Sequence, residues 1–170
     1  VGLGGKLLAA RLNGDLVAHN FPLVVGYNAG VQKILIVGSG DVARRILSRI
    51  VSHARVYALL RSAGRMAEWR DAGAMPVLAD LDDRGSLQRI AGLADYVLHL
   101  APPPGEGRLD TRTRNLLAAL GKAKSLPRRL VYVSTTGVYG DCGGAQIDET
   151  RRLNPESARA GRRVDAERCL

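Results

Sequence analysis

The segment Gly38–Ala43 constrains this chain more than any other, because its two glycines and a small residue follow an apolar run at once. The run at residues 34–37 is β-branched and predicts a buried strand, and the residues after Ala43 have helical spacing. In a G-x-G-x-x-A turn the first glycine permits a sharp bend, the second leaves bare main chain for a pyrophosphate, and the third position allows close packing. The pattern indicates a dinucleotide site, although a plain tight turn has the same appearance. The candidate contacts in this segment are Gly38, Ser39, Gly40, Asp41 and Val42.

Short apolar runs alternate with helical patterns along the rest of the chain. The expected strands are residues 34–37, 55–60, 75–78, 96–100 and 130–133. The expected helices begin at Val42 and cover residues 64–72, 86–91, 110–123 and 155–168, and the first has Val42, Ile46, Leu47 and Ile50 on its apolar face. This alternation predicts an α/β fold, a doubly wound parallel sheet of Rossmann-like strand order 3-2-1-4-5. Ligands in such sheets bind beyond the carboxyl ends of the strands.

Residues 31–170 are expected to form one nucleotide-binding domain, with residues 1–30 as an N-terminal extension of unclear structure. The apolar run near the start is interrupted by Arg11 and Asp15, too early for a signal peptide. No apolar run is long enough to span a bilayer. Cys142 and Cys169 have neither metal-ligand spacing nor a disulfide framework, so we expect no metal and a reduced, cytoplasmic setting.

The formal net charge of +9 suits a nucleic acid, an anionic membrane or a phosphorylated ligand. The arginines are scattered, and no aromatic side chains interleave with them as a stacking platform for single strands requires. We therefore expect a dinucleotide and a small molecule or sugar nucleotide as partners, with neither nucleic acid nor membrane, and leave an oligomer open.

The end of the second strand selects between NAD and NADP. NAD-binding versions place a carboxylate there for the ribose 2′-hydroxyl, whereas this chain has Arg61 and no carboxylate before Glu68. An arginine can pair with the 2′-phosphate, so we predict that NADP is preferred over NAD, through Arg61 with help from Arg44 or Arg65. An ordinary surface arginine is the alternative reading.

The ends of the third and fourth strands supply further candidates. Asp80 and Leu81 can meet the adenine edge, or Asp80 can be a turn residue. His99 is expected to be a packed strand residue rather than a base.

Four segments together resemble the NAD(P)-dependent epimerase/dehydratase branch of the extended short-chain dehydrogenase/reductase superfamily. They are residues 38–43, 79–83, 99–101 and 133–141, of which the last is similar to the family's Ser-Ser/Thr-x-x-Val-Tyr-Gly signature. The resemblance covers about residues 33–168 and implies an oxidoreductase or sugar-nucleotide-modifying enzyme. It further implies that Ala101 contributes to the cofactor site and that Thr135, four residues before Tyr139, polarises the substrate. A threonine in such a loop can instead cap its own backbone.

The chain departs from the family at its Tyr-x-x-x-Lys, whose positions hold Arg159 and Arg163. A guanidinium stays protonated and cannot be a general base, but Arg163 can hold a ribose hydroxyl. Because the sequence ends at Leu170, we also expect an incomplete sheet and no substrate domain. Two functions stay open: an enzyme that uses another acid/base, and a non-catalytic dinucleotide-binding module such as a redox sensor.

Overall fold

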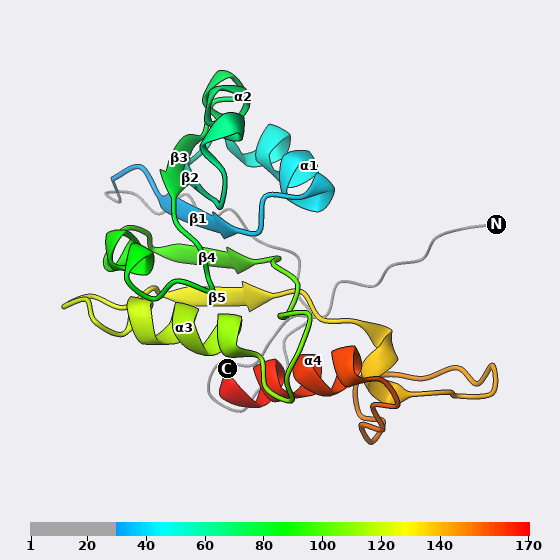
Figure 1. Ribbon diagram of the computed structural model, residues 1–170. Helices are drawn as coiled ribbons and strands as arrows, with labels where there is room; N and C mark the ends of the chain where they lie inside the picture. The colour runs from blue at the N-terminus through cyan, green and yellow to red at the C-terminus, as the bar shows by residue number, and fades with distance from the viewer. Residues whose placement is uncertain (1–29) are drawn as a thin grey trace.

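The computed structural model describes residues 30–170, which form a five-stranded parallel sheet with helices on both faces (Figure 1). The strand order is β3-β2-β1-β4-β5. The predicted fold class and strand order are therefore confirmed. Of the extension predicted at residues 1–30, residues 1–29 lie outside the described residues.

The elements alternate along the chain as the apolar runs predicted. The strands are β1 (Lys33–Val37), β2 (Arg55–Leu60), β3 (Met75–Leu78), β4 (Tyr96–His99) and β5 (Arg129–Tyr132). The helices are α1 (Asp41–Ile50), α2 (Met66–Asp71), α3 (Thr111–Leu120) and α4 (Ala158–Cys169), and the 3-10 turns are η1 (Ala63–Arg65), η2 (Ser86–Ile90) and η3 (Thr136–Tyr139). The helices expected at 110–123 and 155–168 start later, because Asp110 and Ser157 are extended or irregular caps whose side chains accept from the first turn. The helix expected at 64–72 is η1 followed by the short α2.

The strand register brings the functional loops to one edge of the sheet. Val37, the last residue of β1, pairs with Leu59 of β2 and with His99 of β4. The loops that begin at Gly38, Arg61 and Leu100 therefore start side by side. The arrows of β1, β4 and β5 in Figure 1 point the same way, toward this carboxyl edge.

Both faces of the central strand are buried, as a parallel sheet between two helix layers requires. Leu35 and Val37 belong to a cluster that includes η2 and α3 residues. Ile34 and Ile36 belong to a second cluster, on the face covered by α1 and α2. The alternation explains why these strands read as continuous apolar runs.

The predicted apolar face of the first helix is wrong at Val42, whose side chain is 49% exposed. The buried residues of α1 are Ala43 and Leu47, while Ile46 and Ile50 are partly buried. The stripe that faces the sheet therefore starts at Ala43 and recurs at helical spacing. Val42 lies one position earlier, about 100° around the helix, so it faces outward.

Helix α4 lies beyond β5, where it contacts α3 and η3 (Figure 1). Its buried Arg162 donates from Nη1 to the carbonyl of Gly107 at 2.8 Å and from Nη2 to that of Gly105 at 3.1 Å. These bonds hold the Pro/Gly-rich crossover loop between β4 and α3. Within residues 30–170, no helix combines the length and the apolar character needed to cross a membrane.

Candidate functional site

A pocket of about 400 Å³ lies at the carboxyl edge, between the loops that follow the first four strands. It brings together most of the predicted cofactor contacts: Gly38, Ser39, Gly40, Arg61, Asp80, Leu81 and Ala101. The lining does not include Asp41, Val42 or Arg163. Asp41 instead forms an exposed ion pair with Arg45 at 2.8 Å.

The two glycines of the first loop have different structural roles. Gly38 has a φ of +101°, and a Cβ there would lie 2.4 Å from the backbone nitrogen of Ala101. At Gly40 a Cβ would meet nothing within 4 Å. Gly38 thus permits the close approach of two loops, whereas Gly40 leaves open space beside the pocket.

The N-terminus of α1 fits a pyrophosphate. Gly40 is the N-cap, and no side chain caps the first turn of this ten-residue helix. Its N–H groups and the positive end of the helix dipole are therefore available to an anion. Gly40 has no side chain, and a Cβ there would occupy the open space beside the main chain. The main chain is therefore accessible at this point, as the binding of a dinucleotide phosphate requires.

Two basic side chains beside this loop share one carboxylate. Arg65 donates from Nη1 to the carbonyl oxygen of Ser39 at 2.8 Å and from Nε to Glu68 at 3.1 Å. Arg44 of α1 meets Glu68 at 2.8 Å. The hydrogen bond from Arg65 lowers the pKa of Glu68 below its usual value, so the carboxylate is ionised at neutral pH. Sequence reasoning missed Glu68, because its approach to the loop depends on how α2 packs.

Arg61 borders the same end of the pocket and is exposed. Within residues 30–170 its side chain makes no hydrogen bond or ion pair, in contrast to Arg44 and Arg65, and its charge only helps to lower the pKa of Asp82. Its guanidinium is therefore available to a ligand.

Arg112 of α3 stabilises the part of the pocket wall formed by the loops after β3 and β4. This guanidinium pairs with Asp82 at 2.6 Å and donates to the carbonyl of Pro102 at 3.3 Å. It thereby joins the loop after β3 to the loop after β4. Asp80, in the loop after β3, accepts from the backbone nitrogen of Asp82 at 3.0 Å, so it is a turn residue as well as part of the lining. No local pattern in the sequence marks Arg112, which lies 30 residues after its partner.

Arg163 is buried and bonded within the protein. Its Nη1 donates to the carbonyl of Val133 at 2.8 Å and to the Tyr132 hydroxyl at 2.9 Å. Burial raises the pKa of Tyr132 to about 12, so the phenol keeps its proton. Arg163 therefore ties α4 to the end of β5, and a ribose contact from it stays a prediction.

The loop after β5 exposes Thr135, the candidate substrate residue. Its Oγ1 accepts from the backbone nitrogen of Gly137 at 3.3 Å and caps η3, as the alternative reading anticipated. The neighbouring Ser134 donates to Glu167 of α4, and burial raises the pKa of that carboxyl. Arg159, at the family's tyrosine position, is exposed.

His99 is buried at the end of β4, which confirms that it is a packed strand residue. Its Nε2 lies 2.8 Å from the hydroxyl of Thr113, which itself donates to Asp110 at 3.0 Å. Since that hydroxyl proton is used, Nε2 must be the donor, so the neutral ring carries its proton on Nε2. Burial, followed by the charge of Arg163, lowers the pKa of His99 to about 3.

This buried histidine makes stability depend on pH. The unfolded chain takes up a proton at His99 below about pH 6.5, while the folded protein does so only near pH 3, so stability falls as the pH drops between these values. We expect wild type to lose about 2 kcal/mol more unfolding free energy than His99→Gln between about pH 7 and 5. Urea unfolding at both pH values measures this. Equal losses in the two proteins would mean that His99 is protonated in the folded state.

The comparisons with known proteins agree with this geometry. A family model described as NAD(P)H-binding matches residues 38–167. A curated relative, the 4-hydroxy-2-methyl-3-oxo-4-farnesyl-3,4-dihydroquinoline-1-oxide ketoreductase of Stigmatella aurantiaca, is 31% identical over 126 residues, covering 68% of this chain and 37% of the relative.

Two solved structures share the fold. A short-chain dehydrogenase/reductase superfamily protein from Agrobacterium tumefaciens with bound NAD is 25% identical, with a TM-score of 0.64 over 80% of this chain and 43% of that one. The UDP-N-acetylglucosamine 4-epimerase of Methanobrevibacter ruminantium M1 is 18% identical, with a TM-score of 0.67 over 84% of this chain and 50% of that one. The chain thus spans half or less of the length of each of these relatives.

Proposed function

This chain belongs to the NAD(P)H-binding family, and from that premise we propose that it is the cofactor-binding part of an NADP-dependent reductase or epimerase-type enzyme. The observation that carries the proposal is the uncapped N-terminus of α1 beside the bare main chain of Gly40, at the pocket formed by the strand ends. When bound, the nicotinamide supplies or accepts a hydride. The chain's own residues hold the pyrophosphate at the start of α1.

The preference for NADP rests on Arg61. It borders the pocket at the end of β2, where the adenosine ribose of a dinucleotide lies in this fold, and no carboxylate follows it directly. A guanidinium that makes no hydrogen bond or ion pair within the described residues suits a phosphate better than a hydroxyl.

The chemical step is proposed for Thr135, at the end of β5, where a hydroxyl donor can polarise a substrate carbonyl. The reductase name of the curated relative supports a carbonyl substrate. Arg159 cannot supply the proton. A separate acid is therefore required for catalysis. If the protein binds the cofactor but turns over neither a carbonyl compound nor a sugar nucleotide, it would instead be a non-catalytic dinucleotide-binding module.

Titration with NADPH and NADH tests the proposal directly. Trp69, the single tryptophan, is buried in α2 with the guanidinium carbon of Arg65 5.9 Å from its ring centroid, so its fluorescence reports on ligands at this corner. We expect saturable quenching by both cofactors and tighter binding of NADPH. Absence of binding would overturn the proposal.

Arg61→Ser isolates the cofactor preference. Loss of one charged contact should weaken NADPH about tenfold and leave NADH within about twofold. Arg70→Ser, an exposed arginine of α2 outside the pocket lining, is the matched control for charge. Equal weakening of both cofactors by Arg61→Ser would assign Arg61 to a general electrostatic role.

A further inference from the structure

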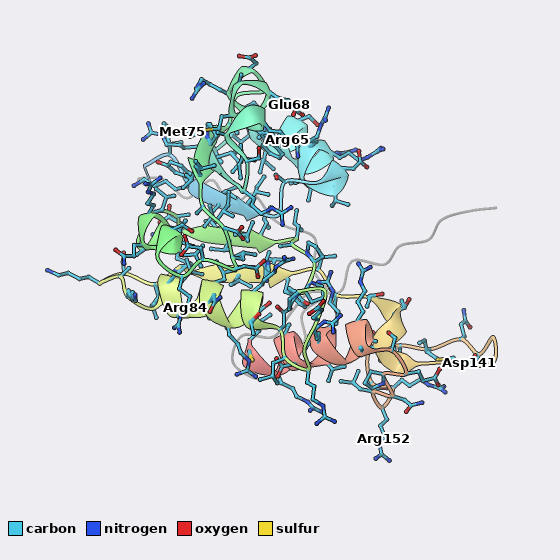
Figure 2. All side chains as sticks on the ribbon, viewed as in Figure 1. Arg65, Glu68, Met75, Arg84, Asp141 and Arg152 are labelled. Atoms are coloured by element: carbon cyan, nitrogen blue, oxygen red, sulfur yellow. The ribbon has the colours of Figure 1, made fainter. Side chains whose placement is uncertain are left out.

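Two arginines, Arg61 and Arg65, line the ribose end of the pocket, and a third, Arg44, lies outside the lining and is joined to Arg65 through Glu68. Within the described part of the chain the Arg61 side chain makes no hydrogen bond or ion pair and only helps to lower the pKa of Asp82, whereas Arg44 and Arg65 both bind Glu68. Figure 2 shows Arg65 and Glu68 together, between α2 and α1. One carboxylate thus neutralises two cations, one of which, Arg65, lines the same pocket as Arg61.

We propose that Glu68 is an internal counter-ion that competes with the 2′-phosphate of NADP for Arg44 and Arg65, and so sets how strongly the site discriminates NADP from NAD. The inference rests on the proposed function, because it requires a dinucleotide in the pocket. The inference assigns part of the discrimination between NADP and NAD to Glu68 in α2, a residue that does not belong to the loop directly after β2.

The geometry supports competition rather than a fixed structural role. The side chains of Arg44, Arg65 and Glu68 are 60%, 41% and 41% exposed, so their ion pairs can exchange at low cost. Arg65 keeps a second anchor, the carbonyl of Ser39, when it releases the carboxylate. A phosphate that already contacts Arg61 would have Arg65 on the same pocket wall.

The chemistry fixes the direction of the effect. The 2′-phosphate carries more negative charge than the Glu68 carboxylate and offers more acceptor oxygens. To bind Arg44 and Arg65 it must either displace the carboxylate or bind close to it, where the two negative charges repel each other. NAD has only a hydroxyl at the 2′ position of this ribose, so its binding does not depend on an ion pair with Arg44 or Arg65. Removal of the charge at Glu68 should therefore favour NADP selectively.

The test compares Glu68→Gln with wild type by quenching of Trp69, at low and moderate ionic strength. We expect Glu68→Gln to tighten NADPH about threefold to tenfold and to leave NADH within about twofold, with a smaller gain at higher salt. Asp71→Asn is the matched control, because it makes the same charge change on the same helix at an exposed residue. It should leave the NADPH-to-NADH ratio within about twofold of wild type.

A second variant assigns the gain to the released arginine. Adding Arg44→Gln to Glu68→Gln should remove part of the gain for NADPH. Three results would overturn the inference: an unchanged ratio in Glu68→Gln, equal tightening of both cofactors, or weaker NADH, the last of which would make Glu68 an acceptor for the ribose hydroxyl. Failure of wild type to bind either cofactor would instead refute the proposed function.

Discussion

Replacement of Gly40 by valine is expected to weaken both NADPH and NADH about a hundredfold or more while the protein stays folded. Gly40 is in an extended conformation, with a φ of −87° and a ψ of −166°, which a β-branched residue adopts without strain. A Cβ there would meet nothing within 4 Å, so the added methyl groups enter space beside the pocket rather than the protein core. They would keep a pyrophosphate from the N–H groups at the start of α1.

The binding loss must be separated from damage to the fold. Circular dichroism and urea unfolding of Gly40→Val should match wild type closely. Gly105→Val provides a control, since Gly105 is also exposed and open to solvent but lies outside the pocket lining. Retained binding by a folded Gly40→Val protein would contradict the phosphate site.

The fold was predictable because its determinants are local in sequence. Apolar runs of strand length, helical spacing and the glycine loop each occupy a few consecutive residues, and a parallel sheet brings the ends of its strands together. The pocket residues Gly38, Gly40 and Arg61 directly follow or adjoin strand ends, so the topology alone places them together.

The missed features depend on distant side chains. Arg65 reaches Ser39 across 26 residues, and Arg112 reaches Asp82 across 30, so neither contact has a sequence signature. Helical spacing also does not show whether the buried face of α1 begins at Val42 or at Ala43, because that depends on how α1 is rotated about its axis when it packs on the sheet. For Arg163 nothing in the sequence indicates the carbonyl partners that the packing of α4 against β5 supplies within the protein, and its ribose contact stays a prediction.

Gly38→Ala is expected to cost about 3 kcal/mol or more of unfolding free energy, a large share of the total for a domain of this size. Two costs add together. The φ of +101° is unfavourable for any residue with a side chain, and the new Cβ would lie 2.4 Å from the backbone nitrogen of Ala101. Because the obstacle is backbone, relief requires the loops after β1 and β4 to separate, which also deforms the pocket wall.

Gly144→Ala separates these two costs. Gly144 has a φ of +77°, but a Cβ there would meet nothing within 4 Å, so this variant pays for the conformation without the clash. We expect a loss of about 1 kcal/mol for Gly144→Ala and a loss at least twice as large for Gly38→Ala, measured by urea unfolding at neutral pH. Equal losses would mean that the loops part freely, and the close approach of Gly38 to Ala101 would then not be what holds the phosphate loop in place.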